Sequence, residues 1–166
     1  MLMHLKTDIE DAAGPLQTCA GLKSGIEASI HTMKNIWQEE TSDAILLVDA
    51  DNAFNRLNRE VALHNIREVC PPIFRYLNNH YQSSADLIIN TATDQDKITS
   101  EEGCTQGDVA AMAKYALGMA PLVNKLGLSV NKDKCKHAWY ADDSSAIGKL
   151  EELKKWWDTL VSEGPK

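Results

Sequence analysis

The feature that most constrains this chain is a pair of adjacent acidic residues, Asp142 and Asp143, set between two runs suited to β-strands, residues 138–141 and 144–148. Turn-favouring residues belong at the bend of a strand-turn-strand unit, so the pair predicts a hairpin that carries two carboxylates at its tip. Side chains at such a bend can converge on a bound ion, and hard divalent cations prefer oxygen ligands. The bland alternative is that the pair only caps a surface turn.

A second acidic position ends an apolar run. Residues 44–48 are uninterruptedly apolar and are followed by Asp49, which predicts a central strand that is buried on both faces. Two such strands side by side would bring Asp49, Asp142 and Asp143 together. Carboxylates that close repel one another unless a cation lies between them, and ligands that are all oxygen suit Mg²⁺ or Mn²⁺.

Three motifs in this order give the chain a family resemblance. They are residues 49–55 (motif A), 103–108 (motif B) and 140–143, Tyr-Ala-Asp-Asp (motif C). The chain resembles the palm of reverse transcriptases, RNA-directed DNA polymerases, especially those of LINE-like (non-LTR) retrotransposons. An upstream block is similar to the Gln- and Gly-containing segment of such enzymes: Gln17, Gly21, Lys23, Gly25 and Ala28. The resemblance covers about residue 16 to the end and implies a truncated palm with part of the fingers and no thumb, after a loosely ordered lead-in over residues 1–15.

The resemblance also implies the ligands of a metal site. Such enzymes transfer a nucleotide to a primer 3′ hydroxyl with two divalent ions, Mg²⁺ or Mn²⁺. Asp49 and Asp142 would be the bridging ligands, Asp143 the third carboxylate, and the backbone carbonyl of Ala50 a ligand of the ion beside the leaving group.

Four further residues receive substrate-binding roles from the same resemblance: Phe54, Gln106, Gly107 and Tyr140. Phe54 would exclude a nucleotide's 2′ hydroxyl, and Gln106 would position template and nucleotide. Gly107 would let backbone approach the substrate, and Tyr140 would pack at the primer side of the hairpin. The alternatives are an ordinary core Phe, a turn Gly before a helix, and a plain strand aromatic. Asn55 stands where related elements often carry Asp.

Composition sets the class of protein and its partners. The chain has 166 residues, 43% hydrophobic and 25% charged, which is typical of one globular domain without a membrane span. Residues 1–6 are too short and polar-flanked to suggest a signal peptide, so an intracellular location, cytoplasm or nucleus, is expected. Its formal charge is −7, and phosphate contacts need Lys and Arg, so this chain alone is expected to bind nucleic acid weakly. RNA or DNA template, primer and deoxynucleotides are the partners expected of the full-length protein.

Hydrophobic periodicity predicts an α+β fold in which helices back an antiparallel sheet. Helices are expected over residues 24–39, 58–69, 73–82, 109–125 and 150–162, and strands over 44–49, 86–90, 97–100, 138–141 and 144–148. Ser24, Asn58 and Asp108 are the expected N-caps, and Pro121 should kink or break its helix.

Three functions remain open at this point. The leading one is a reverse transcriptase palm. The second is a catalytically inactive remnant that folds without polymerase activity. The third, another two-metal palm enzyme such as a nucleotidyl cyclase, is disfavoured because Tyr140 and Ala141, rather than two Gly residues, precede the acids, and because Gln106 and Gly107 would have no role there.

Overall fold

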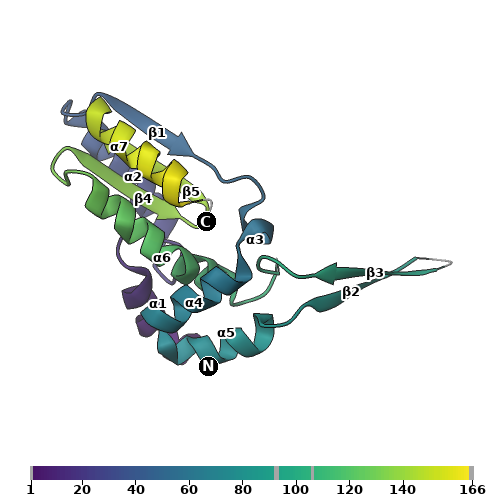
Figure 1. Ribbon diagram of the computed structural model, residues 1–166. Coiled ribbons are helices and arrows are strands. Elements are labelled where there is room, and N and C mark those ends of the chain that lie inside the picture. Colours follow the sequence, from purple (N-terminus) through teal and green to yellow (C-terminus); the bar gives the residue numbers. More distant parts are fainter. Residues whose placement is uncertain (1, 92–93, 106, 165–166) are drawn as a thin grey trace.

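The computed structural model describes residues 2–91, 94–105 and 107–164. The elements in chain order are a 3₁₀ helix Leu2–Leu5, α1 Lys6–Ala13, α2 Gly25–Gln38, β1 Ala44–Val48, α3 Ala53–Arg56, α4 Arg59–Val69, α5 Pro71–Tyr81, β2 Ala85–Asn90, β3 Gln95–Ser100, α6 Ala111–Ser129, β4 Cys135–Tyr140, β5 Asp143–Gly148 and α7 Leu150–Glu163 (Figure 1). The fold is α+β with antiparallel sheets, as predicted.

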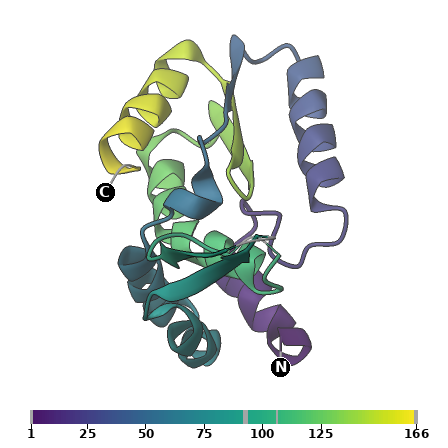
Figure 2. The ribbon, with the colours of Figure 1, turned by 90° about the vertical axis from the view of Figure 1, so that its right-hand side faces the viewer.

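The main sheet has three strands in the order β1-β5-β4, all antiparallel. It lies between α2 on one side and α6 and α7 on the other (Figure 2). Side chains alternate between the two faces of a strand, so Cys135, His137 and Trp139 of β4 turn their buried side toward α6 and α7, while Lys136 is exposed.

The prediction that residues 44–48 form a strand is confirmed, but the prediction that this strand is central is wrong. β1 is an edge strand, and β5 is central. Leu47 is 74% exposed, because the face of β1 that carries it is not covered. An uninterrupted apolar run therefore marks a strand here without marking burial on both faces.

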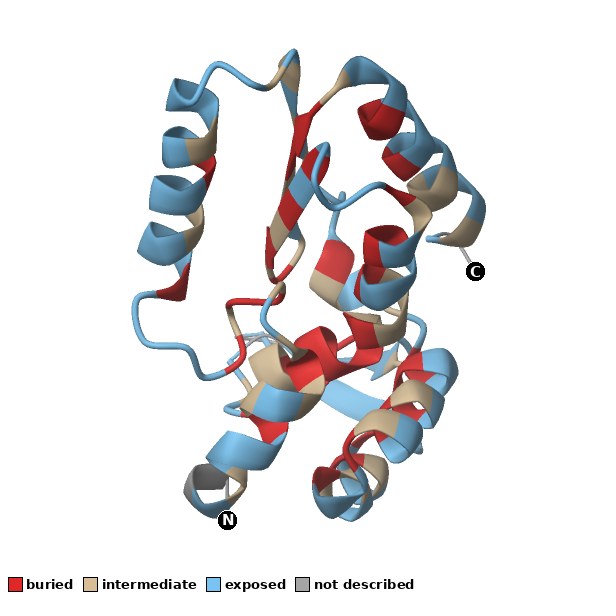
Figure 3. Cartoon of the chain, turned by 90° about the vertical axis from the view of Figure 1, so that its left-hand side faces the viewer, coloured by how far each residue is buried: buried red, intermediate tan, exposed pale blue. Residues whose placement is uncertain are grey.

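Helix α6 connects two parts of the core. Its first half packs with α1, α4 and α5 around Ile66, Ile73 and Leu117. Its second half packs with α7 and the main sheet around Leu126 and Trp156. Buried residues follow this helix along much of its length (Figure 3), so α6 holds the sheet and the helical half together.

Most predicted helix positions are confirmed, with different ends. Asn58 caps α4 by accepting a hydrogen bond from the Val61 backbone N–H at 3.0 Å. Ser24 has a φ of 55° and makes no side-chain cap hydrogen bond, so the predicted side-chain cap at Ser24 is absent. Helix α6 begins at Ala111 rather than directly after Asp108, and it continues through Pro121 without a break.

The N-terminal segment is more ordered than expected. A loose lead-in is predicted for residues 1–15, but Lys6–Ala13 form α1. Its residues Ile9 and Ala13 are 6% and 3% exposed and belong to the core cluster that includes α6. Burial of these two apolar side chains stabilises α1, although the composition of the segment as a whole is polar.

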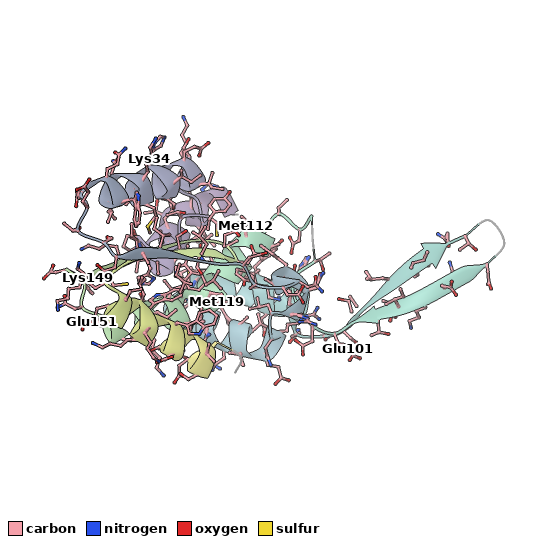
Figure 4. All side chains as sticks on the ribbon, turned by 90° about the horizontal axis from the view of Figure 1, so that it is seen from above. Lys34, Glu101, Met112, Met119, Lys149 and Glu151 are labelled. Carbon is pink, nitrogen blue, oxygen red and sulfur yellow. The ribbon has the colours of Figure 1, made fainter. Side chains whose placement is uncertain are left out.

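The second sheet is the hairpin β2–β3, which extends away from the body of the molecule (Figure 4). No described helix is long and apolar enough to cross a lipid bilayer. All four cysteines are free.

Candidate functional site

Strand β1, which precedes Asp49, is hydrogen-bonded to β5, which begins at Asp143. Val48, the last residue of β1, pairs with Ser144 of β5, and Tyr140 of β4 pairs with Asp143. Asp49 follows Val48, so the antiparallel register brings it beside Asp143 at one end of the sheet. The sequence analysis expected the strands that precede Asp49 and Asp142 to lie side by side, but β5 separates β1 from β4, and the second strand of the hairpin is the neighbour of β1.

Electrostatic repulsion connects the three carboxylates. Burial raises the pKa of Asp143, and the negative charges of Asp142 and then Asp49 raise it further. Like charges disfavour the ionised form of a neighbour, so this end of the sheet is a region of concentrated negative potential. A cation would relieve that repulsion.

Asp142 occupies the tip of a two-residue hairpin turn. Tyr140 and Asp143 are the closing pair, and Ala141, the first turn residue, has a φ of 54°. The left-handed region is unfavourable for a residue with a Cβ, and such strain is often found at functional sites. Ala141 is nonetheless 3% exposed, so the surrounding structure holds the turn in place.

A cleft of about 880 Å³ opens beside this turn. Its wall includes Asp142, Ala50 and Asp51 but neither Asp49 nor Asp143. Helices α4, α6 and α7 supply most of the remaining wall. The motif A and motif C residues therefore border one concave surface, although their carboxylates do not all face it.

The donor set suits a hard divalent ion, but the ligands are not gathered. Asp49, Asp142 and Asp143 offer only oxygen atoms, as Mg²⁺ and Mn²⁺ prefer. In the described part of the chain, no three His, Cys, Asp or Glu side chains are grouped closely enough to hold a metal ion. The donor chemistry therefore fits the metal, but the side chains as placed do not form a three-ligand site.

Phe54 lies against an aromatic residue that the sequence analysis missed. Its ring stacks on Tyr115 of α6 with centroids 4.6 Å apart and an interplanar angle of 25°. Burial raises the pKa of Tyr115, and the negative charge of Asp142 raises it further. The Tyr115 phenol therefore lies near the hairpin turn. Phe54 is half-buried, so part of its ring stays available.

The motif B loop packs directly on motif A. The Gly103 N–H donates to the Leu57 carbonyl at 3.0 Å, and the Cys104 N–H donates to the Phe54 carbonyl at 2.6 Å. Gly103 has a φ of 72°, and a Cβ there would lie 2.4 Å from the Phe54 oxygen. Only glycine fits this contact.

Of Gln106 and Gly107, the two motif B residues with a predicted substrate-binding role, the structure describes only Gly107. Gln106 lies outside the described residues, and its predicted role stays a prediction. Gly107 is exposed, with a φ of 89°, and a Cβ added there would have no atom within 4 Å. The backbone at Gly107 is therefore open to solvent in a conformation that glycine adopts readily.

Two buried cations support this loop from behind, and the sequence pattern did not single them out. Lys114 is 0% exposed, its Nζ donates to the Gly103 carbonyl at 2.9 Å, and it lies 3.6 Å from the centroid of the Tyr81 ring. Burial lowers the pKa of Lys114 to about 8. Arg59 donates to the carbonyls of Gly103 and Glu102 at 3.3 and 2.8 Å. For Lys114, the sequence does hold a signal, because a lysine stands within an Ala-rich, apolar helix.

Comparisons with known proteins give one kind of match. Neither a protein-family model nor a curated protein sequence matches this chain. Among solved structures, it is similar to apo telomerase from Candida tropicalis truncated from its C-terminal domain, with a TM-score of 0.67 and 16% sequence identity. The match covers 96% of this chain and 36% of the telomerase chain, so the chain spans about a third of that neighbour.

At this identity the match defines the fold. The three-stranded antiparallel sheet and the helices that pack on it form a fold of reverse-transcriptase type. Telomerase, the neighbour in question, is related to the reverse transcriptases, which agrees with the resemblance that motifs A, B and C suggest.

Proposed function

We propose that this chain is the palm of a reverse transcriptase of LINE-like retrotransposon type, which adds deoxynucleotides to a primer 3′ hydroxyl on a nucleic-acid template. The observation that carries the proposal is the strand register that sets Asp49 beside the Asp142–Asp143 turn at one end of the sheet. In a fold of this type, that end borders the cleft that contains Ala50 and Asp142.

Each residue has a role that follows from its position. Asp49, Asp142 and Asp143, with the Ala50 carbonyl, would hold two divalent ions, with Asp49 and Asp142 as the bridging ligands. When bound, the ions would acidify the attacking hydroxyl and neutralise the leaving pyrophosphate. The chain's own contribution is placement, because Gly103 and Cys104 fasten the motif B loop to the backbone of Phe54 and Leu57.

Phe54 is proposed to select deoxynucleotides. A ring beneath the sugar rejects an additional 2′ oxygen by overlap, and this requires that the ring not move away. The stack on Tyr115 at 4.6 Å limits that movement. Gln106, Gly107 and Tyr140 are proposed to contact template, nucleotide and primer, as the family resemblance implies.

The second candidate is a remnant without polymerase activity. Two observations favour it: the formal charge of −7 and the absence of a grouped three-ligand site in residues 2–91, 94–105 and 107–164. An acidic chain that covers about a third of its structural neighbour has few cations with which to hold a polyanion.

Primer extension distinguishes the two candidates. The chain would be incubated at low salt with excess RNA template, a DNA primer, deoxynucleotides and Mn²⁺, in parallel with Asp142→Asn. The proposal predicts extension by the wild type that falls at least a hundredfold in the variant, since a metal ligand is lost. No extension by either protein at saturating primer-template would favour the remnant, and equal extension by both would contradict the role of Asp142 as a metal ligand.

A further inference from the structure

A short upstream segment runs beside the strand that leads to the hairpin turn. Gln17 forms a parallel bridge with Trp139 of β4. The Trp139 N–H donates to the Leu16 carbonyl at 2.7 Å, and the Thr18 N–H donates to the Trp139 carbonyl at 2.8 Å. These bonds bring the Gln17 side chain level with the turn, 124 positions later in the sequence.

The Gln17 carboxamide makes two hydrogen bonds to the backbone of Ala141. Its Nε2 donates to the Ala141 carbonyl at 3.2 Å, and its Oε1 accepts from the Ala141 N–H at 3.0 Å. Both residues are 3% exposed, so water does not compete for these groups. A carboxamide is the neutral side chain that can donate and accept in this way.

The hydrogen-bonded residue is the one with unfavourable backbone geometry. Ala141 has a φ of 54° and lies directly before Asp142. A buried, two-point attachment can hold a strained conformation that the residue itself disfavours. The direction in which the Asp142 carboxylate leaves the turn depends on this backbone.

The segment that carries Gln17 is itself held firmly. Thr18 Oγ1 donates to the Trp139 carbonyl at 2.9 Å and lies 3.0 Å from the Ser29 hydroxyl of α2. A Cβ at Gly25, the first residue of α2, would lie 2.0 Å from the Thr18 carbonyl oxygen. Helix α2 therefore presses the segment against β4, which limits the movement of Gln17.

We propose that Gln17 is a positioning residue, which holds the Ala141 backbone so that Asp142 presents its carboxylate for metal binding. The inference rests on the proposed function, because it assigns Asp142 to a metal site. Gln17 acts through the turn and touches neither metal nor substrate.

The test compares Mn²⁺ affinity and amide hydrogen exchange in four forms of the chain: wild type, Gln17→Leu, Gln17→Glu and Thr18→Val. Gln17→Leu removes both hydrogen bonds at similar size. Gln17→Glu retains the acceptor for the Ala141 N–H, and it serves if the Leu variant does not fold. Thr18→Val is the matched control, because it removes the side-chain hydrogen bonds of the adjacent residue but keeps the backbone bonds to Trp139 and both Gln17–Ala141 hydrogen bonds.

We expect Gln17→Leu to weaken Mn²⁺ binding at least tenfold and to accelerate exchange of the Ala141 amide at least tenfold, while amides in the middle of β5 keep their protection. Gln17→Glu should lie between this variant and the wild type, and Thr18→Val should bind Mn²⁺ like the wild type. A purely structural role would not change metal affinity in a folded variant.

Two results would overturn the inference. One is unchanged exchange at Ala141 in Gln17→Leu, and the other is faster exchange with unchanged Mn²⁺ affinity. A failure of the proposed function looks different, because wild type and Asp142→Asn would then bind Mn²⁺ equally.

Discussion

Single residues connect the motifs that lie far apart in the sequence. Gly103 joins motif B to motif A because its backbone enters the space beside the Phe54 and Asn55 carbonyls, where a Cβ would lie 2.4 and 2.5 Å from the two oxygens. Gln17 joins the upstream block to motif C in a comparable way. Both residues act through backbone groups, and sequence spacing does not report such contacts.

Gly103→Ala should therefore be strongly destabilising. The added Cβ overlaps with the Phe54 and Asn55 carbonyl oxygens, and alanine disfavours the positive φ. We expect a loss of about 3 kcal/mol in the free energy of unfolding. Gly107→Ala is the control, since its φ of 89° is also positive but no atom lies within 4 Å, and it should cost about 1 kcal/mol. Urea titration of both variants measures the difference, and equal losses would show that the contact with motif A contributes nothing.

His137 should make stability depend on pH. Burial lowers its pKa from 6.5 to about 4, and its Nδ1 accepts a hydrogen bond from the Trp139 Nε1–H at 3.1 Å. The unfolded chain binds the proton more readily than the folded one between these two values, so stability falls as the pH drops through this range. From pH 7 to pH 5 the expected contribution is a loss of about 2 kcal/mol.

The His137→Gln variant isolates this contribution, because the new side chain does not titrate. Its free energy of unfolding should decline less between pH 7 and pH 5 than that of the wild type. Parallel pH profiles for the two proteins would mean that His137 titrates normally in the folded state.

At the scale of elements, the β2–β3 hairpin contributes little to the body of the molecule. Every described residue from Ala85 to Thr99 is exposed, and a two-stranded hairpin is marginally stable by itself. The body of the molecule holds the base of the hairpin, where Arg59 donates at 3.3 Å to both the Ser83 and the Ser100 carbonyls.

Shortening this hairpin should leave the stability nearly unchanged. If residues 88–97 are replaced by Asn-Gly, a two-residue turn closes the Leu87–Ile98 pair, and the free energy of unfolding should change by less than about 1 kcal/mol. Arg59→Met, which keeps the hairpin but leaves buried carbonyls unpaired, should cost about 3 kcal/mol. Thermal unfolding compares them, and a larger loss from the shortened hairpin would show that it packs on the body.

Local sequence patterns predict the helices and strands themselves, but they do not predict which elements pair or pack with one another. Asn58 predicts the start of α4 correctly because a cap involves only residues a few positions apart. The apolar run of residues 44–48 predicts a strand correctly, but its position at the sheet edge depends on which strands pair. Lys114 is 0% exposed because Gly103 and Tyr81 come to it from other segments.

At the scale of the whole molecule, the candidate site depends on two parts of the core. The main sheet carries Asp49 and the Asp142–Asp143 turn, and the helical half carries the motif B loop. Helix α6 spans both and brings Tyr115 to Phe54. The sequence predicted the hairpin that carries Asp142 and Asp143, but it did not predict that β5 would lie between β1 and β4 or that the three carboxylates would not be grouped.

Mn²⁺ titration by calorimetry tests the shared metal site most directly, with wild type, Asp49→Asn, Asp142→Asn and Asp133→Asn as a control. Asp133 is exposed and lies before β4, at the opposite end of the strand from the turn. The account predicts that Asp49→Asn and Asp142→Asn each weaken binding at least tenfold, while Asp133→Asn binds like the wild type. Equal affinity in all four proteins would contradict it.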